Sequence, residues 1–342
     1  MDTLAIVVLN YNGLPFLRRF LPALLAQADG HPVYVADNAS TDGSVSWLRL
    51  QFPAVRVIQL ETNNGYAGGY NQALERVRSE YGGATYYALV NSDIEVTPNW
   101  IAPVLQLLEG DSAIAACQPK IRSEQQRESF EYAGAAGGYL DYLGYAFCRG
   151  RVFDVLEPDT GQYDDNRPVF WATGACLFVR ATVFHETGGF DSAFFAHMEE
   201  IDWCWRVQRL GYSVWTCGQS TVYHVGGGTL HKSNPHKTLL NHRNSLYMLY
   251  KNWPADGWFL SKVFMRLVFD GLSSVLYLAA GQWGDIGAVL KAHGAFYGHL
   301  PTLNKQRRQL KQQEKQRANL YERSLVWQYF GKGHRRFSQL DK

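Results

Sequence analysis

The stretch from Tyr86 to Asp93 reads YYALVNSD, an apolar run that ends in a polar triplet with a carboxylate. A run that is apolar at nearly every position is typical of a strand buried on both faces of a sheet. Such a strand places Asp93 at its carboxyl end, where a carboxylate can hold a divalent cation against a diphosphate. Taken alone, an acid in this place is more often a helix cap or a solvated turn residue.

A second acidic cluster follows much later in the chain, in the stretch FFAHMEEIDW that begins at Phe194. It contains Glu199, Glu200 and Asp202. A carboxylate of such a cluster can take a proton from an attacking hydroxyl group. Together the two motifs suggest group transfer from a nucleotide-activated donor.

The sequence around the first motif alternates apolar runs with helix-length segments, which predicts an α/β fold with a parallel sheet covered on both faces. We expect strands at 4–9, 33–36, 55–60 and 86–90, and helices at 14–28, 44–51, 68–81 and 100–108. Ligands of such sheets bind at the carboxyl ends of the strands. We therefore expect four strand ends to converge on one crevice that contains Asn10, Tyr11, Asn12, Asp37, Asn64, Gly65, Asn91, Ser92 and Asp93.

Glycines at 65–69 precede a predicted helix, whose first N–H groups could approach phosphate or sugar oxygens. Residues 111–170 are rich in glycine and tyrosine and suggest hairpins or a long loop over the crevice. Further on we expect an ordered run at 169–179, helices at 182–187 and 199–210, and strands at 214–216 and 221–225. Trp203 and Trp205 could stack on sugar rings, although core packing is the more common fate of such residues.

Composition narrows the class of protein. The 342 residues, 46% of them hydrophobic, suffice for one large core or two smaller ones, and a formal net charge of +2 does not indicate a nucleic-acid partner. Five cysteines without a C-x-x-C pair suggest neither a disulfide framework nor a thiolate zinc site, so a reducing compartment fits best. No basic leader precedes the first apolar run, and we expect a cytoplasmic protein, with the inner face of the cell membrane left open as its place.

Two other nucleotide-binding classes fit poorly. An acid after the second strand, here Asp37, also occurs in dinucleotide-binding domains, but these need G-x-G-x-x-G after the first strand. The chain offers only NYNG at 10–13, which argues against nicotinamide or flavin binding. A sugar-phosphate nucleotidyltransferase would need basic residues in the same loop, and none are present there.

These motifs resemble, in order and spacing, the inverting family 2 glycosyltransferases of the GT-A fold, and most of all the rhamnosyltransferase-type branch that builds bacterial surface polysaccharides. The resemblance covers residues 3–250 and rests on the segments 7–13, 37–44, 63–71, 91–93, 173–180, 188–191, 199–202 and 224–228. It implies a mostly parallel nucleotide-binding sheet flanked by helices. Residues 1–250 would form the catalytic domain, and 251–342 a helical, amphipathic and basic C-terminal region.

The resemblance also implies a metal site. Asp93 matches the last acid of the family's D-x-D motif, which binds Mn²⁺ or Mg²⁺ on the donor diphosphate. Asn91 stands in the first position, so a single strong anionic ligand remains. His224 matches a histidine that can complete the metal sphere, and imidazole suits Mn²⁺ better than Mg²⁺. The alternative for His224 is a strand-end residue before a glycine turn.

The catalytic roles follow from the same resemblance. Glu200 matches the general base by register, with Glu199 left open as the base instead. Glu199 and Asp202 would otherwise orient the base, cap the helix or contact the acceptor. Asn71 joins the expected donor contacts.

The implied function is that of a metal-dependent inverting glycosyltransferase. It would move a sugar, with rhamnose as the first candidate, from a dTDP- or UDP-sugar to a glycan or lipid-linked acceptor. A catalytically inactive sugar-nucleotide-binding homologue is the alternative from another class. The joint retention of Asp93, Glu200 and His224 argues against that alternative.

The C-terminal region is electrostatically distinct, because residues 301–342 hold eleven Lys or Arg against three Asp or Glu. Before it, the mostly apolar segment 258–280 carries Lys262, Arg266 and Asp270 in one helical stripe, and these charges argue against a membrane-spanning helix. Aromatic residues that flank the segment suit a membrane interface. We expect peripheral membrane contact through this region, with packing on the catalytic domain or homo-oligomer formation as the alternatives.

Overall fold

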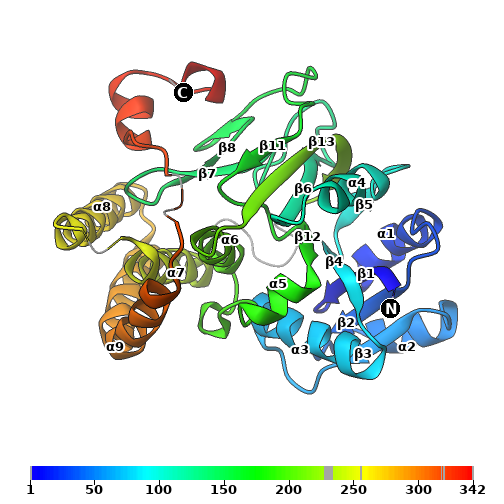
Figure 1. The fold of residues 1–342 in the computed structure, drawn as a ribbon. Coiled ribbons are helices and arrows are strands. Elements are labelled where there is room, and N and C mark those ends of the chain that lie inside the picture. The colour runs from blue at the N-terminus through cyan, green and yellow to red at the C-terminus, as the bar shows by residue number, and fades with distance from the viewer. Residues whose placement is uncertain (1, 227–233, 255, 317, 319, 341–342) are drawn as a thin grey trace.

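A computed structural model describes residues 2–226, 234–254, 256–316, 318 and 320–340. These residues form a large nine-stranded sheet, a small four-stranded sheet and a layer of long C-terminal helices (Figure 1). The predicted α/β class with a helical C-terminal extension is confirmed.

The N-terminal half of the large sheet is parallel, as predicted. Its strands, in spatial order, are β4 (Ala84–Asn91), β1 (Asp2–Asn10), β2 (Val33–Asp37) and β3 (Arg56–Gln59). The helices of this half are α1 (Leu14–Ala26), α2 (Ser44–Gln51), α3 (Gly65–Glu80) and α4 (Ala102–Gly110). The expected elements of residues 1–110 are thus confirmed to within a few residues at their ends.

Helices cover both faces of this half, which explains why its strands are apolar throughout. Alternate residues of β1 belong to opposite cores: Val7 packs in the cluster that includes Leu74 of α3, and Val8 in the cluster that includes Leu17 of α1. Side chains of a strand alternate between faces, so two buried faces require an unbroken apolar run.

The other half of the sheet is mixed. β12 (Cys176–Arg180) lies antiparallel between β4 and β6 (Ile114–Ser123). β13 (Ser213–His224) runs parallel to β6 and antiparallel to both β5 (Ile94–Val96) and β11 (Arg167–Val169). The two strands predicted at 214–216 and 221–225 are one strand, whose register with β6 shifts between Cys217 and Thr221.

Hairpins fill part of the stretch 111–170, as expected. The small sheet consists of β7 (Gly138–Leu140), β8 (Ala146–Cys148), β9 (Arg151–Val152) and β10 (Val155–Leu156), all antiparallel. The C-terminal segment 320–340 returns to this sheet and buries Leu325 and Leu340 against Phe147 and Val152. It includes the short helices η2 (Trp327–Gly331) and η3 (Phe337–Gln339).

Two short helices precede the second acidic cluster, and a third helix begins at the cluster itself. These are α5 (Ala181–Glu186), η1 (Ser192–Phe194) and α6 (Glu199–Arg209). The helical layer follows, with α7 (Pro235–Asn252), α8 (Phe259–Ala279) and α9 (Trp283–Gln313). The boundary predicted at residue 250 falls near the end of α7, which packs extensively on α9. Among the described residues, no helix combines the length and apolarity needed to cross a bilayer.

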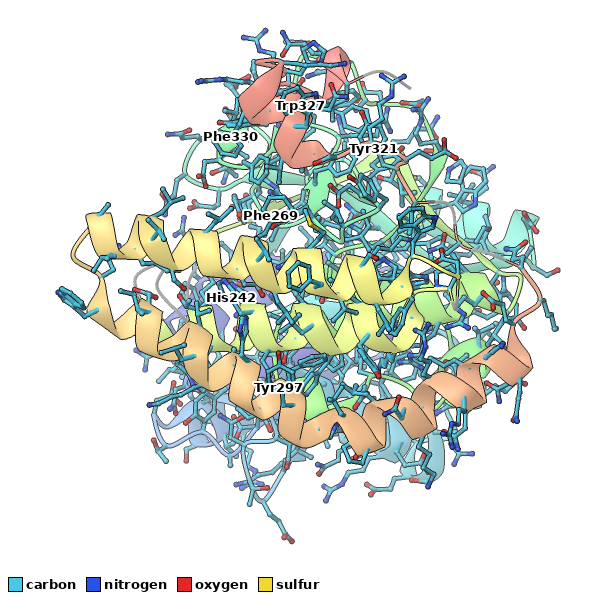
Figure 2. All side chains as sticks on the ribbon, turned by 90° about the vertical axis from the view of Figure 1, so that its left-hand side faces the viewer. His242, Phe269, Tyr297, Tyr321, Trp327 and Phe330 are labelled. Carbon is cyan, nitrogen blue, oxygen red and sulfur yellow. The ribbon has the colours of Figure 1, made fainter. Side chains whose placement is uncertain are left out.

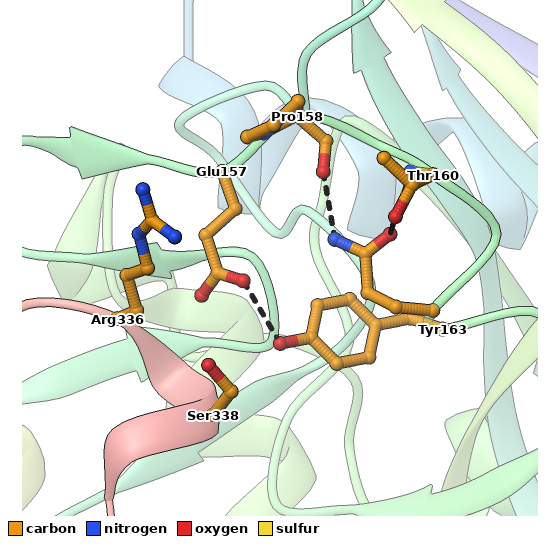
Figure 3. Close-up of a pocket in the computed structure, with 7 residues that line it drawn as sticks. Glu157, Pro158, Thr160, Tyr163, Arg336 and Ser338 are labelled. Atoms are coloured by element: carbon orange, nitrogen blue, oxygen red, sulfur yellow. Dashed lines mark hydrogen bonds between the residues drawn. The ribbon is translucent and has the colours of Figure 1, made fainter.

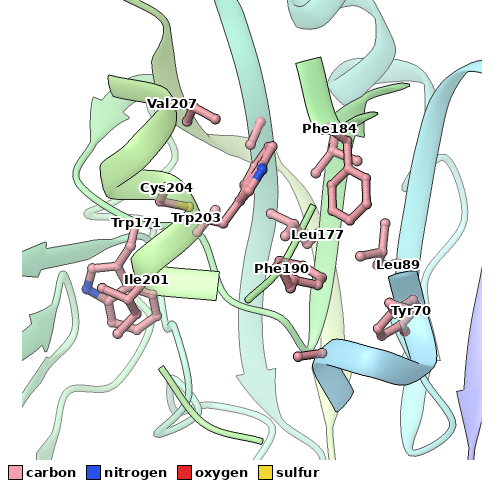
Figure 4. Packing of buried hydrophobic residues seen from close by; sticks show 14 of the residues in the cluster. Tyr70, Leu89, Trp171, Leu177, Phe184, Phe190, Ile201, Trp203, Cys204 and Val207 are labelled. Carbon is pink, nitrogen blue, oxygen red and sulfur yellow. The ribbon is translucent and has the colours of Figure 1, made fainter. Parts of the chain in front are cut away.

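The core between the sheet and α6 is strongly aromatic. Trp203 lies in it beside Phe184 and Phe190 (Figure 4), and its indole N–H donates to Thr187 Oγ1 at 2.8 Å. Trp205 is buried as well and packs edge-on against Phe170. Both tryptophans therefore serve the core rather than a sugar ring.

Candidate active site

The ends of β1 and β2 are joined by buried polar side chains. Asn10 Nδ2 donates to Asp37 Oδ1 at 2.9 Å, and the Ser40 N–H donates to Asp37 Oδ2 at 2.9 Å. Asn10 Oδ1 is buried without a hydrogen-bond partner. Burying a hydrogen-bond acceptor without a donor costs free energy. Asn10 Oδ1 is therefore free to accept a hydrogen bond from a ligand at these strand ends.

The residues after β1 form the rim of the crevice. Asn12 has a positive φ of 49° and accepts from the Thr41 N–H at 2.8 Å, which ties the β1 loop to the β2 loop. The ring of Tyr11 is exposed beside it. A β-carbon at Gly13 would lie 2.5 Å from Asn10 Oδ1 and 3.0 Å from Ser92 Oγ, so the β1 and β4 loops also meet here.

Asn38, the residue after Asp37 at the end of β2, organises the loop after β3. Its Nδ2 donates to Asn63 Oδ1 and to the Gly65 carbonyl, both at 2.9 Å, and its Oδ1 accepts from the Asn64 N–H at 3.1 Å. The Asn64 side chain turns back to Thr62. Hydrogen bonds therefore join the ends of β1, β2 and β3 into one polar network, and Ser92 of the β4 loop lies beside the β1 loop.

The glycines at the start of α3 have a different role from the predicted one. The Ala67 N–H donates to the Phe195 carbonyl at 3.2 Å, so a protein oxygen occupies the place expected for a phosphate or sugar oxygen. Gly65 has a φ of 67°, and a β-carbon there would lie 2.2 Å from the same carbonyl oxygen. Asn71, predicted as a donor contact, bonds to the N–H and C=O of Phe190 at 3.0 and 2.7 Å. These residues hold the loop that precedes α6.

Asp93 and His224 meet at the ends of two strands. β5 begins directly after Asp93 and pairs with β13, placing Ile94 opposite His224. His224 Nε2 lies 3.2 Å from Asp93 Oδ1, and both side chains are buried. Burial favours a neutral carboxyl, but the His224 imidazole outweighs it and holds the pKa of Asp93 below its usual value.

Glu131 lies on the other side of the imidazole and was missed by sequence reasoning. Its Oε2 is 3.3 Å from His224 Nδ1, and it is buried as well. Burial alone would lower the pKa of His224, yet the carboxylates of Asp93 and Glu131 raise it to about 10. Glu131 follows an irregular stretch between β6 and β7, where no periodicity marks it, so only the folded chain brings it to the site.

These residues suit a cation held by few protein ligands. Within the described ranges, no three metal-binding side chains face one point. The 3.2 Å between Asp93 Oδ1 and His224 Nε2 matches the roughly 3 Å between neighbouring ligands of an octahedral ion with bonds of about 2.1 Å. Glu131 would stay outside the metal sphere and orient the imidazole through its other nitrogen.

The acidic pair starts α6. Glu199 is buried, whereas Glu200 is partly accessible. Burial and the neighbouring Glu200 raise the pKa of Glu199 well above its usual value. Burial also raises the pKa of Glu200, to about 6, although nearby backbone N–H groups favour its charged form. Burial therefore opposes two negative charges in this pair, and Glu199 is the harder of the two carboxyls to ionise.

Backbone contacts link Glu200 to the first motif. The Gly174 N–H bonds to Glu200, and the next residue, Ala175, accepts from the Asn91 N–H at 2.9 Å. The Tyr66 hydroxyl donates to the Gly174 carbonyl at 2.6 Å. The stretch before β12 thus brings both predicted motifs to one crevice.

Asp202 lies on the far side of the same helix start and is fully buried. It accepts from Arg206 Nε at 2.9 Å and from Asn252 Nδ2 at 2.7 Å, and Lys251 Nζ lies 3.0 Å away. With both oxygens engaged, Asp202 anchors α6 to α7. Of the three roles expected for Asp202, orienting the base, capping the helix or contacting the acceptor, this buried position is compatible with the first.

The loop before α6 is strained and clamped. Phe195, His197 and Met198 have positive φ values of 64°, 72° and 73°, an uncommon conformation for residues other than glycine. Asn244 of α7 donates through Nδ2 to the carbonyls of Phe194, Ala196 and His197 at 2.9, 2.8 and 2.7 Å. Sequence reasoning missed Asn244, because nothing in its local pattern indicates contact with a loop so far away in the chain.

A cavity of about 460 Å³ opens elsewhere, between the small sheet and the C-terminal segment. Its lining includes Glu157, Tyr163 and Arg336, and the Tyr163 hydroxyl donates to Glu157 at 3.1 Å (Figure 3). None of the predicted site residues lines it. The acidic and imidazole side chains Asp93, His224 and Glu131 meet instead at the ends of β4 and β13.

Comparison with known proteins gives consistent results. The sequence model of glycosyl transferase family 2 matches residues 5–184, more than half of the chain. Over 274 residues the chain is 28% identical to N-acetylglucosaminyl-diphospho-decaprenol L-rhamnosyltransferase of Mycobacterium tuberculosis. That match covers 75% of this chain and 87% of the mycobacterial protein.

Two solved structures share the fold. The crystal structure of GalNAc-T7 with UDP, GalNAc and Mn²⁺ matches with a TM-score of 0.56 at 16% identity. The match covers 75% of this chain and 49% of GalNAc-T7, so this chain spans about half the length of that protein. Mannosyltransferase PcManGT from Pyrobaculum calidifontis, in complex with GDP-Man and Mn²⁺, matches with a TM-score of 0.51 at 14% identity, over 86% of each chain. At these identities the likeness concerns the fold alone.

Proposed function

Because the chain belongs to glycosyl transferase family 2, and is therefore a glycosyltransferase of glycan synthesis, we propose that it moves a sugar from a nucleotide diphosphate to a lipid-linked saccharide with inversion. One juxtaposition supports the proposal: Asp93 and His224 lie 3.2 Å apart at the ends of two strands, and the segment Gly174–Ala175, which neighbours Glu200, also accepts from the Asn91 N–H at 2.9 Å. A cation site and a base would thus lie near one another.

The donor would lie across the carboxyl ends of the strands. The exposed ring of Tyr11 is placed to stack on a nucleobase, and the unpartnered Asn10 Oδ1 can accept from a base or ribose group. Asp37 acts through Asn10, because its own oxygens are already bonded. Asn64, Asn91 and Ser92 stay in the proposed donor set, whereas Gly65 and Asn71 shape the loop beside it.

Asp93 and His224 would hold Mn²⁺ or Mg²⁺, with donor phosphate oxygens completing the ligand set. When bound, the ion supplies positive charge that stabilises the leaving nucleoside diphosphate. The protein's own part is to supply the Asp93 carboxylate and to orient the neutral imidazole of His224 through Glu131.

Glu200 would act as the general base. It takes the proton of the acceptor hydroxyl while the oxygen forms a bond to the anomeric carbon and the bond from that carbon to the phosphate oxygen breaks. Attack from the face opposite the leaving group inverts the anomeric centre. The protonated Glu199 next to it avoids a second negative charge in the buried site.

The acceptor and sugar follow from the mycobacterial relative, whose name gives a rhamnose transferred to a lipid-linked N-acetylglucosamine. We propose dTDP-rhamnose as the first donor to test and an N-acetylglucosaminyl diphospholipid as the first acceptor. A UDP-sugar is the second donor to test.

The experiment has a binding arm and a transfer arm. Thermal shifts are recorded with dTDP, UDP, GDP and their sugars, with and without Mn²⁺, because ligands that bind the folded state raise its melting temperature. Transfer to the acceptor lipid is followed by mass spectrometry. Asp93→Asn should abolish the Mn²⁺-dependent shift, while Asp29→Asn, a change at an exposed turn, should not.

The outcomes separate the alternatives. A Mn²⁺-dependent shift without transfer to any acceptor would indicate an inactive sugar-nucleotide-binding homologue. Release of pyrophosphate from a nucleoside triphosphate and a sugar phosphate would indicate a nucleotidyltransferase. Binding of the donor that Asp93→Asn leaves unchanged would remove Asp93 from the site.

A further inference from the structure

The helix α8 carries its apolar residues on the outside. Leu260, Phe264 and Leu276 are 75%, 64% and 70% exposed, and Leu272 and Val275 are more than half exposed. Their spacing places them on one side of a helix that spans residues 259–279. Soluble proteins normally turn such a stripe toward the core, so this face lacks its usual cover.

The charged residues of α8 face inward instead. Arg266 and Asp270 are buried and bonded to each other, Nε to Oδ1, at 3.1 Å, and His293 of α9 lies 3.3 Å from the second Asp270 oxygen. Lys262, the remaining charged residue, pairs with Asp256 at 3.0 Å. The buried polar contacts therefore hold the charged side of α8 against α9. The outer side of α8 carries no charged residue.

Exposed aromatic residues extend this face. Trp258, which precedes α8, and Trp283, the first residue of α9, are 72% and 70% exposed. Trp327 and Phe330 of the C-terminal segment are also exposed and lie above α8 in Figure 2. Ring contacts from Phe269 through Tyr145 and Phe153 to Phe330 connect α8 with this segment.

The charge around the face is one-sided. Among the described residues from 256 to 340, Glu322 is the only fully exposed acid. Exposed basic residues in the same range include Lys291, Lys305, Arg308, Lys311, Lys332, Arg335 and Arg336. An apolar helix face near exposed tryptophans, with these basic residues on the adjoining α9 and C-terminal segment as its basic surround, matches the chemistry of an anionic bilayer surface.

We propose that the outer face of α8, with Trp258, Trp283, Trp327 and Phe330, docks on an anionic membrane. A second copy of the chain would present an equally basic surround to this face, and like charges would oppose that contact. The proposal deepens the proposed function, because it would hold the enzyme where a lipid-linked acceptor lies, but its evidence is independent of the transfer reaction.

The test uses the full-length protein and vesicles of phosphatidylcholine with or without phosphatidylglycerol, and no donor or acceptor is added. The double variant Leu272→Gln with Leu276→Gln removes two apolar anchors from the outer face. The matched control is Leu50→Gln on α2, a leucine that is 77% exposed. Circular dichroism and thermal melts verify that each variant is folded.

We expect wild type and control to float with anionic vesicles, and the double variant to bind at least about tenfold more weakly, a loss of about 1.4 kcal/mol. Added salt should weaken binding by screening the basic surround. Unchanged vesicle binding by the folded double variant would overturn the proposal. A second result would also overturn the proposal: neither protein binds vesicles, and light scattering shows that wild type is a dimer whereas the double variant is a monomer. Because no sugar is transferred, these results leave the proposed function to be judged separately.

Discussion

At the scale of single residues, Glu199 and Glu200 have different environments. Glu199 is buried beside another acid, whereas Glu200 is reached by solvent and by backbone N–H groups. Glu200→Gln keeps the shape but cannot accept a proton, so turnover should fall by about 10²–10⁴-fold while donor affinity changes little. Steady-state kinetics and donor titration measure both. If Glu199→Gln is the crippled variant instead, the base is Glu199.

The same residue predicts a pH profile. Because the pKa of Glu200 is raised to about 6 and the base must be unprotonated, turnover should decline as the pH falls through about 6. An unperturbed glutamate would give this decline near pH 4.3. Measuring kcat between pH 5 and 8, at saturating donor and Mn²⁺, tests for this decline on the acid side. A flat profile over that range would argue against Glu200 as the base.

Glu131 predicts a positioning effect on the cation site. Glu131→Ala removes the carboxylate that faces His224 Nδ1, and Mn²⁺ should bind about 10–100-fold more weakly in the presence of dTDP. Glu131→Gln retains an oxygen acceptor and should recover part of the affinity. Calorimetric titration reads this directly, without turnover. Equal Mn²⁺ affinity in wild type and Glu131→Ala would show that the imidazole needs no such support.

At the scale of elements, α7 holds the loop that leads into the catalytic helix. Asn244→Ala removes the side-chain donor from the Ala196 and His197 carbonyls, while the Phe194 carbonyl keeps Arg243, so residues 195–198 should relax from their strained conformation. We expect the free energy of unfolding to fall by about 1–3 kcal/mol and kcat to fall more than donor affinity. Denaturant melts and kinetics measure the two effects. Gln312→Ala, at an exposed position on α9, is the control.

At the scale of the whole molecule, the basic C-terminal region is part of the folded body. Leu325 is fully buried against the small sheet, and its N–H donates to Asp141 at 2.8 Å. Leu325→Ala should therefore cost about 2–5 kcal/mol of unfolding free energy, whereas Leu290→Ala, at an exposed site on α9, should cost within about 0.5 kcal/mol. Equal melting of the two variants would show that the segment is dispensable. A chain truncated before residue 320 would lose the same packing and could unfold. Point variants on the surface therefore test membrane contact better than a truncation does.

The sequence alone determined the parallel half of the sheet and the pair of acidic motifs. Strands apolar on every residue can only be buried on both faces, and the polar residues that end them must then meet at one edge, as Asn10 and Asp37 do. The donor set, the cation site and the base remain predictions for experiment.

Tertiary structure decided what local pattern could not. Gly65 looked like a phosphate-binding glycine, but the Phe195 carbonyl from a distant loop fills that space. Glu131 and Asn244 carry no local signal, because their partners are far away in the chain. The polar stripe of α8 would face water on an isolated helix, yet it faces α9, where Asp270, already paired with Arg266 of its own helix, meets His293. Side-chain periodicity gives the faces of a helix, and only the partners available in the folded chain decide which face turns inward.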